Sequence, residues 1–302
     1  MKFVITGGAG FIGSHIAKHL VEKNHDVIIV DNLSRGRLEN LSKIKEQIEF
    51  KKMDILDFNS LKDIISNSDG IFHQAALTSV PESFTQEEKY HDVNVKGTEN
   101  IFKIAKEFGK KVVYASSSSI YGNTTTIPIQ ENFEKNPINP YGITKLDDEI
   151  LAEKYHKLGV SIIGLRYFNV YGIGQTIDYA GVITKFIDQI NQNKSPIVFG
   201  NGIQTRDFIS VEDIAKANLL SMESNIDFSF LNIGTGISTS IKKLAEIMIE
   251  LSGKKLEINY DDLPLGDVKD SLADVSLAKK LINWRYETSL KNGLEKFFFF
   301  KN

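Results

Sequence analysis

The sequence predicts an α/β protein: a Rossmann-type, doubly wound parallel sheet with a smaller, interleaved C-terminal α/β unit. Short apolar runs alternate with amphipathic stretches through the first half, which is the pattern of consecutive βαβ units. Runs such as Val27–Val30 are apolar at every position, as strands covered on both faces require. After Leu165 the alternation loosens without a shift in composition, so we expect the two units to share the chain.

Apolar periodicity places the predicted elements along the chain. In the first half we expect strands at Phe3–Ile5, Val27–Val30, Glu49–Lys52, Gly70–His73, Val112–Ala115 and Ser161–Leu165. The helices expected between them are Phe11–Glu22, Leu61–Ile65, Val93–Glu107 and Lys145–Lys157. A loop-rich stretch follows over residues 167–180. In the second half the expected strands are Ile197–Phe199, Asp207–Ile209, Phe228–Asn232 and Leu256–Asn259, and the expected helices are Val182–Asn191, Val211–Met222, Ser240–Leu251, Ser276–Leu281 and Ser289–Phe300.

The composition excludes several classes of protein. The 302 residues include 36 Lys and Arg, 39 Asp and Glu, and no cysteine, so disulfide scaffolds, thiol nucleophiles and cysteine-bound metals are ruled out. A net charge of -3 argues against a general nucleic-acid or anionic-membrane binder. No apolar run reaches the ~18 residues of a membrane span, and the run at the start is too short for a signal peptide. We therefore expect a cytoplasmic protein.

A glycine-rich loop directly follows the first predicted strand. It reads TGGAGFIG and contains the spaced glycines Gly7, Gly10 and Gly13. Such a loop turns tightly, brings backbone N–H groups to a pyrophosphate and uses the dipole at a helix N-terminus. Asp31 follows the second strand, where a carboxylate accepts hydrogen bonds from an adenosine ribose and repels a 2′-phosphate. We therefore expect NAD rather than NADP, although Arg35 and Arg37 are close enough in sequence to weaken that preference.

Residues after the next two strands complete the predicted cofactor groove. Asp54 and Ile55 follow the third strand, where an adenine amino group would be bound, but a helix cap explains Asp54 equally well. Small residues after the fourth strand let the backbone approach a cofactor, although tight turning explains them too. The cofactor contacts expected from this part of the chain are Gly7, Gly10, Phe11, Ile12, Asp31, Asn32, Ser34, Gly36, Asp54, Ile55, Gln74, Ala75 and Ala76.

A run of serines and a Tyr–Lys pair follow the fifth strand. Ser116–Ser119 lies at its carboxyl end, the edge where open parallel sheets bind ligands. Tyr141 and Lys145 share one helical face at an i, i+4 spacing. A free tyrosine has a pKa near ~10, and a nearby ammonium and an oxidised nicotinamide would lower it. The arrangement is typical of general acid–base catalysis of hydride transfer from an alcohol.

Together these motifs resemble the extended short-chain dehydrogenases/reductases of the nucleotide-sugar 4-epimerase group. The resemblance covers nearly the whole chain and is carried by TGGAGFIG, DNLS, SVPES, NVKGT, YASSSSIYG, YGITK, LRYFNVYG, QTRDFI and GDVKDSLAD. It implies a catalytic hydroxyl on Ser117, a base on Tyr141 and its partner on Lys145. The cofactor contacts that it implies in this part of the chain are Asn94, Tyr141, Lys145 and Tyr167. The substrate contacts that it implies are Ser79, Ser117, Ser118, Asn169, Gly181, Val182, Lys185, Phe199, Arg206, Asp267 and Ser271.

One departure from the family pattern concerns the substrate diphosphate. Pro264 stands where the family commonly carries an arginine, and the chain has only five arginines. Arg206 then becomes the main anchor, with Lys185 or Lys269 in support as point charges that lack a bidentate fork. Ser271 lies where a small residue leaves room for an N-acetyl group, so we expect both plain and N-acetylated hexoses.

The resemblance implies an NAD-dependent UDP-sugar 4-epimerase that works through a 4-keto intermediate, on UDP-glucose/UDP-galactose and on the N-acetylated pair UDP-GlcNAc/UDP-GalNAc. It also implies a homodimer, an NAD-binding unit of residues 1–168 with 206–235, and a substrate unit of residues 169–205 with 236–302. Related dehydratases carry Asp-Glu where this chain has Ser118-Ser119, and this difference argues against a dehydratase. The alternatives are a UDP-glucuronate 4-epimerase, another nucleotide-sugar oxidoreductase and, more distantly, a non-catalytic dinucleotide-sensing protein.

Two groups of polar residues receive a structural interpretation. His15 and His19 lie one helical turn apart, but no further ligand motif accompanies them, so we expect no metal site. Asp147-Asp148-Glu149 is expected to be a solvated helix face.

Overall fold

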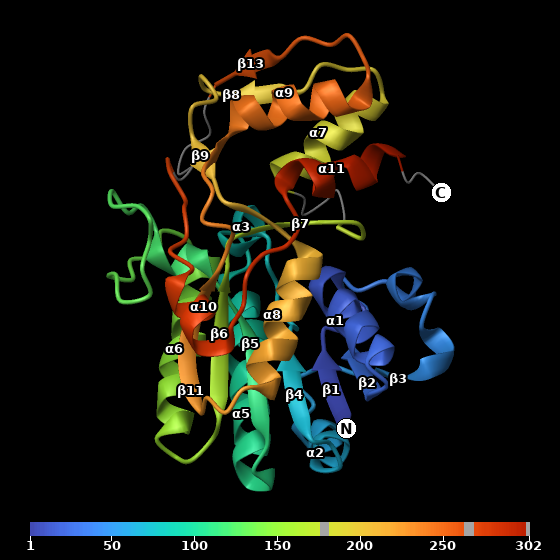
Figure 1. Cartoon of the computed structure of the whole chain (residues 1–302). Coiled ribbons are helices and arrows are strands. Elements are labelled where there is room, and N and C mark those ends of the chain that lie inside the picture. Colours follow the sequence, from blue (N-terminus) through green and yellow to red (C-terminus); the bar gives the residue numbers. More distant parts are fainter. Residues whose placement is uncertain (176–180, 263–268, 300–302) are drawn as a thin grey trace.

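Within the described residues, the central sheet has seven parallel strands in the order β11-β6-β5-β4-β1-β2-β3 (Figure 1). The computed structural model describes residues 1–175, 181–262 and 269–299. The strands are β1 Lys2–Thr6, β2 Asp26–Asp31, β3 Ile48–Lys52, β4 Gly70–His73, β5 Lys111–Ser117, β6 Ile162–Tyr167 and β11 Phe228–Ile233. The strand order reverses direction between β1 and β4, so a ligand crevice is expected at the carboxyl ends of these two strands. The predicted Rossmann-type fold is confirmed.

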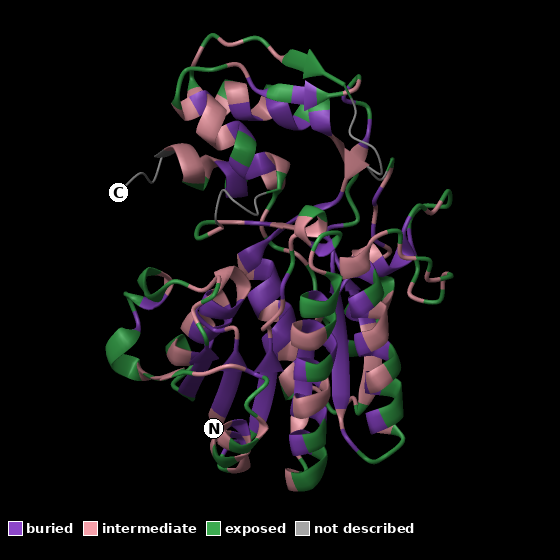
Figure 2. Cartoon of the chain, turned by 180° about the vertical axis from the view of Figure 1, so that it is seen from behind, coloured by how far each residue is buried: buried purple, intermediate pink, exposed green. Residues whose placement is uncertain are grey.

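Helices cover both faces of this sheet. One face packs against α1 Phe11–Glu22, α8 Val211–Glu223 and α10 Ser276–Ile282, and the other against α2 Phe58–Ser66, α5 Gly97–Phe108 and α6 Pro140–His156. The inner strands β1, β2, β4, β5 and β6 are mostly buried (Figure 2), whereas the edge strand β3 has no fully buried residue. Shorter elements connect them: the 3-10 turns Leu38–Leu41, Lys45–Gln47 and Ser118–Tyr121, the helices α3 Val80–Ser83 and α4 Glu87–Tyr90, and a π-helical turn at His91–Lys96.

A smaller unit lies above the carboxyl edge of the sheet. Its helices α7 Val182–Asn191, α9 Ile241–Ser252 and α11 Leu290–Phe299 lie together (Figure 1) and share a separate core. Three short strand pairs accompany them: β7 Asn169–Tyr171 with β10 Phe208–Ser210, β9 Thr205–Arg206 with β12 Thr239–Ser240, and β8 Ile197–Phe199 with β13 Asn259–Asp261. The crevice of the large sheet therefore opens toward this unit.

The chain enters the core of the large sheet a last time near its end. Trp284 is 1% exposed and belongs to the same apolar cluster as Phe3, and its Nε1 donates to the backbone oxygen of Asp213 at 3.0 Å. The Asp213 carboxylate accepts from the backbone N–H groups of Glu287 and Thr288. The predicted division assigns residues 236–302 to the substrate unit, whereas α10 and Trp284 pack in the core of the sheet.

Several predicted elements match the structure in their bounds, among them α1, β4, α7 and β8. Two predictions were wrong: the expected loop after residue 167 contains β7, and the expected strand at residues 256–259 begins only at Asn259. Both strands are only three residues long and exist because distant segments pair with them. In the described part of the chain, no helix is both long and apolar enough to span a bilayer.

Candidate active site

The glycine loop between β1 and α1 lies at the floor of the crevice. Gly7 has a φ of +68°, and a Cβ there would lie 2.6 Å from the backbone nitrogen of Ala75. A Cβ on Gly13 would lie 2.3 Å from the carbonyl oxygen of Gly7. Only glycine fits at these two points, because the loop, the start of α1 and the end of β4 approach one another at backbone contact distance. The N-terminus of α1 has no side-chain cap, so its first N–H groups are not occupied by one and suit a phosphate.

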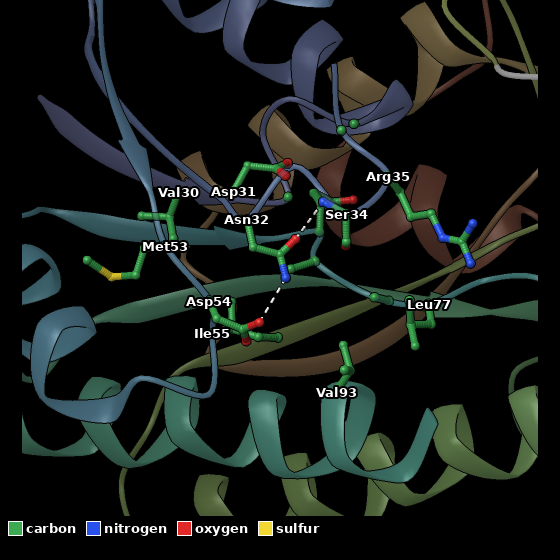
Figure 3. Close-up of a pocket in the computed structure, with 16 residues that line it drawn as sticks. Val30, Asp31, Asn32, Ser34, Arg35, Met53, Asp54, Ile55, Leu77 and Val93 are labelled. Atoms are coloured by element: carbon green, nitrogen blue, oxygen red, sulfur yellow. Dashed lines mark hydrogen bonds between the residues drawn. The ribbon is translucent and has the colours of Figure 1, made fainter. Parts of the chain in front are cut away.

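The adenosine end of the crevice is bounded by the ends of β2 and β3 (Figure 3). Asp31 accepts hydrogen bonds from the backbone nitrogens of Ala9 (3.0 Å) and Leu33 (2.8 Å). Burial raises the pKa of Asp31, and these two bonds oppose the rise. Asn32 donates to the Asp54 carboxylate at 2.8 Å, and both residues line this pocket.

The sequence left open whether Arg35 weakens the preference for NAD and whether Asp54 caps a helix. Arg35 points away from the Asn32–Asp54 pair (Figure 3), and its guanidinium binds Glu82, with an Nη2–Oε1 distance of 2.7 Å. The cap of α2 is Asp57, whose side chain accepts from the nitrogen of Ser60. Asp54 therefore does not cap this helix. The predicted residues that line this end are Gly7, Gly10, Asp31, Asn32, Ser34, Gly36, Asp54, Ile55, Gln74, Ala75 and Ala76.

Ser117, Tyr141 and Lys145 line one cavity of about 290 Å³ together with the glycine loop. Asn139 caps α6 by accepting from the nitrogen of Gly142 at 2.8 Å, and this cap fixes the turn that carries Tyr141. The Ser117 hydroxyl donates to the Ser119 hydroxyl at 3.0 Å and accepts from the Ser119 nitrogen at 3.1 Å. The structure thus brings the three predicted catalytic residues and the cofactor loop to one space, which Phe11, Ile12 and Tyr167 also line.

The ammonium of Lys145 is held from inside the protein. Its Nζ donates to the carbonyl oxygen of Ala115 at 3.1 Å and to the Asp148 carboxylate at 2.9 Å. Asp148 is 0% exposed and Glu149 is 1% exposed. The expectation that residues 147–149 form a solvated face was therefore wrong for two of them; only Asp147 is half-buried.

Glu149 belongs to a second buried network beneath the site. Arg166 binds both of its carboxylate oxygens at 2.8 Å, and the Ser116 hydroxyl donates to the same carboxylate at 2.7 Å. Arg166 also donates to the hydroxyl of Tyr121 at 2.7 Å. Burial would lower the pKa of Arg166, but the bonds to Glu149 and Tyr121 raise it above its ordinary value. This network ties α6 to β5 and β6 next to the predicted catalytic residues.

Two predicted cofactor residues make hydrogen bonds inside the protein. Asn94 is buried and uses its amide on the backbone nitrogen and oxygen of Leu77 and on the hydroxyl of Thr144. It is not among the residues that line the crevice. The Tyr167 hydroxyl meets Gln74 and Asn218, and burial raises its pKa. Asn94 thus joins the loop after β4 to α6, and Tyr167 forms part of the cavity wall.

The predicted substrate residues are spread over both units. Ser79 caps α3, and its hydroxyl accepts from the nitrogen of Glu82. Asn169 donates to the backbone oxygen of Asp207, and Arg206 donates to the backbone oxygen of Thr205 at 2.8 Å. The others are Ser118 in the turn after β5, Gly181 as the cap of α7, Val182 and the exposed Lys185 on α7, Phe199 on β8 and the buried Ser271. Asp267 lies outside the described residues.

Asp207 has a structural role that the sequence alone does not predict. Its buried carboxylate accepts from the nitrogens of Thr235, Gly236 and Ala273 and from the hydroxyl of Thr235. These bonds join the segments that cross between the two units. The QTRDFI motif contains this residue, but its role depends on partners that lie far along the chain.

His15 and His19 both contact the carboxylate of Glu212, at 3.1 and 2.9 Å. This triad connects α1 to the first turn of α8. No cluster of three or more metal-binding side chains is found in the part of the chain that is described.

The arrangement fits a dinucleotide. The crevice at the switch point of the sheet is formed by the glycine cradle, the uncapped start of α1, the Asp31 carboxylate and the cavity that Ser117, Tyr141 and Lys145 line. A Rossmann-type sheet with this loop and a Tyr–Lys helix defines the class of extended short-chain dehydrogenases/reductases. Residues 3–234 match the NAD dependent epimerase/dehydratase family, and the chain belongs to this family. Its cofactor is NAD.

Three solved structures are similar over nearly the full length of both chains. A UDP-N-acetylglucosamine 4-epimerase from Methanobrevibacter ruminantium, in complex with UDP-N-acetylmuramic acid, is 37% identical with a TM-score of 0.94, covering 98% of this chain and 96% of that one. A UDP-glucose 4-epimerase from Thermotoga maritima with UDP-glucose is 35% identical with a TM-score of 0.93, at the same coverage. A UDP-glucuronic acid 4-epimerase from Bacillus cereus, with UDP-glucuronic acid and NAD, is 30% identical with a TM-score of 0.91, covering 99% and 98%.

Proposed function

We propose that this protein is an NAD-dependent 4-epimerase of neutral UDP-sugars, acting on UDP-glucose/UDP-galactose and on the N-acetylated pair. One observation carries the proposal: Ser117, Tyr141 and Lys145 line the same cavity as the glycine loop. A base, its cationic partner and an orienting hydroxyl are the groups that oxidation and re-reduction of a secondary alcohol require. The similar structures support a sugar nucleotide as the source of that alcohol, and their sugars differ.

In the proposed reaction Tyr141 removes the proton of the sugar 4-hydroxyl while Ser117 orients the sugar oxygen. The Lys145 ammonium stabilises the Tyr141 phenolate by its positive charge. NAD, when bound, supplies the redox chemistry at C4. The 4-keto sugar then rotates in the site and presents its opposite face. Tyr141 returns the proton to the oxygen as C4 is reduced again, and the product has the opposite configuration at C4. Because the oxidation is reversed in the same site, no cofactor is consumed.

For the nucleotide end we propose that Arg206 is the main contact of the diphosphate, supported by Lys185. Ser79, Ser118, Asn169, Gly181, Val182, Phe199, Asp267 and Ser271 are proposed as further contacts. An acidic sugar would need a cationic partner at its carboxylate. Arg166 is committed to Glu149 and Arg35 binds Glu82, which favours a neutral sugar over UDP-glucuronate.

The proposal is tested by incubating the protein with UDP-glucose, UDP-N-acetylglucosamine and UDP-glucuronate and separating the C4 epimers by chromatography. We expect conversion of the first two without accumulation of NADH. Turnover of UDP-glucuronate alone would support the acidic-sugar alternative. Net NADH would indicate an oxidoreductase, and no turnover on any sugar would support a sensing protein.

We also propose a homodimer that forms through the outer face of α6. Ile143 and Ile150 are 48% and 57% exposed and lie two helical turns apart on α6, so they form an apolar stripe on its outer face. By contrast, Ile101, Ile104 and Ala105 of α5 are fully buried within the chain. Sedimentation of the wild type and of Ile150→Asp tests the proposed dimer. We expect the wild type to sediment as a dimer and Ile150→Asp as a monomer. A monomeric wild type would refute the proposal.

A further inference from the structure

We propose that Asp148 is a positioning residue for the reaction: it is the counterion that keeps Lys145 charged and in place beneath Tyr141. Tyr141, Lys145 and Asp148 follow one another at i, i+4 and i+7 on α6, so all three lie on its inner face. The motif that predicts the site ends at Lys145. Asp148 enters only because the structure turns its carboxylate onto the Lys145 ammonium at 2.9 Å. This inference rests on the proposed function of Tyr141.

Burial makes this contact a strong one. The side chains of Lys145 and Asp148 are 4% and 0% exposed, so little solvent screens the pair. An ammonium in such a place loses its hydration and favours the neutral amine unless a partner compensates. The remaining bond of the Lys145 Nζ is to the neutral carbonyl of Ala115, which carries no formal charge. Asp148 therefore supplies the nearest compensating charge.

The pKa directions agree with this geometry. Burial would lower the pKa of Lys145, but Asp148, Tyr141 and Glu149 together raise it above its ordinary value. Burial raises the pKa of Asp148 to about 6, and Lys145 opposes the rise. Above that pH the pair is an ammonium and a carboxylate, which is the state that the proposed reaction needs.

The other groups around Asp148 do not take over this role. From α5, Thr98 contributes a hydroxyl beside the carboxylate, and that hydroxyl meets the His73 imidazole of β4 at 2.9 Å. Burial lowers the pKa of His73 to about 3, so this imidazole stays neutral during catalysis. From β5, burial raises the pKa of Tyr114 well above its ordinary value, so it stays neutral too.

The remaining charges near the pair lie on α6 itself. Glu149 is bound by Arg166, and Asp147 is half-buried near His91. Asp148 is thus the acid in direct contact with Lys145.

The sign of its effect on catalysis follows from charge alone. A nearby negative charge makes proton loss harder for every group that it contacts, so Asp148 raises the proton affinity of the Tyr141–Lys145 pair. This extends the pH range in which Lys145 is charged, and it makes Tyr141 harder to ionise. Removing the charge must lower both apparent pKa values of the pair.

The test compares the pH profiles of kcat/KM of the wild type, Asp148→Asn and the neighbouring control Asp147→Asn. We expect both limbs of the Asp148→Asn profile to move to lower pH by about one unit, because a contacting charge shifts a pKa by about 1–3 units. The control should superimpose on the wild type. An alkaline limb of Asp148→Asn that coincides with the control would overturn the inference while leaving the epimerase function intact.

A second readout does not depend on turnover. The tyrosinate absorbance of a protein minus that of its Tyr141→Phe counterpart titrates Tyr141 alone. We expect a lower midpoint in the Asp148→Asn background than in the wild-type background, and equal midpoints would overturn the inference even if no sugar is converted. If Asp148→Asn does not fold, Asp148→Ala takes its place in the test. It removes the same charge with a smaller side chain, so we expect the same shift. If neither variant folds, Asp148 serves stability and the inference fails.

Discussion

The buried Arg166–Glu149 pair leads to a stability prediction that can be worked from the structure. Glu149→Gln keeps the shape of the side chain, but its amide carries two N–H donors where one carboxylate oxygen now accepts from Arg166. Both side chains are 1% exposed, so the guanidinium is left without its counter-charge in a dry core. Breaking such a pair costs about 3–5 kcal/mol of unfolding free energy. At about 2–4 °C per kcal/mol, the melting temperature should fall by about 6–20 °C.

The assay is urea denaturation followed by circular dichroism, with Glu107→Gln as the control. Glu107 pairs with Lys62 at 2.6 Å, but the two side chains are 46% and 37% exposed. Such surface pairs contribute about 0–1 kcal/mol. A loss for Glu149→Gln no larger than that of the control would refute the reasoning, because burial would then not decide the cost. The double variant Arg166→Met/Glu149→Leu should lose less unfolding free energy than the single variants Arg166→Met and Glu149→Leu lose together.

Three further predictions concern the crevice and its supports. Tyr141→Phe should lose about 10²–10⁴-fold in turnover with unchanged circular dichroism and NAD retention; turnover like that of the wild type would contradict the assignment of the base. Gly13→Ala places a Cβ 2.3 Å from the Gly7 oxygen, so we expect NAD to be lost during gel filtration, whereas Gly109→Ala, outside the crevice, should keep it. Contacts with His15 and His19 hold the pKa of Glu212 well below its ordinary 4.5. This lowered pKa stabilises the fold above pH 4.5 and the effect is lost as pH falls further, so Glu212→Gln should cost about 1–2 kcal/mol at pH 7 and progressively less below pH 4 in urea titrations.

The fold was predictable because its signals are local. The bounds of α1 and β4 follow from apolar runs and periodicities that each segment carries by itself. The crevice was predictable for a related reason: parallel strands bring their carboxyl ends to one edge, so residues after Thr6, Asp31 and Ser117 must meet there.

The errors arose where a distant partner decides the outcome. Asp148 and Glu149 are typical of a solvated helix face by residue type, and their burial depends on Lys145 and on Arg166. The strand β7 has only three residues, and it forms because β10 lies beside it. The pairing of β13 with β8 likewise places that strand later than its apolar residues predict. Charge and periodicity in a single window cannot indicate such partners.

The membership of Trp284 in the same apolar cluster as Phe3 has a consequence for how the chain is made. A ribosome releases Phe3 long before Trp284, so the apolar cluster that contains both residues lacks a fully buried side chain until Trp284 has emerged. The edge strand β11 and the clamp of Asp213 on Glu287 and Thr288 also arrive late. Many multidomain chains complete an N-terminal domain while the rest is still being translated. In this protein the central sheet lacks its edge strand until β11 has been translated, and its core stays incomplete until Trp284 follows.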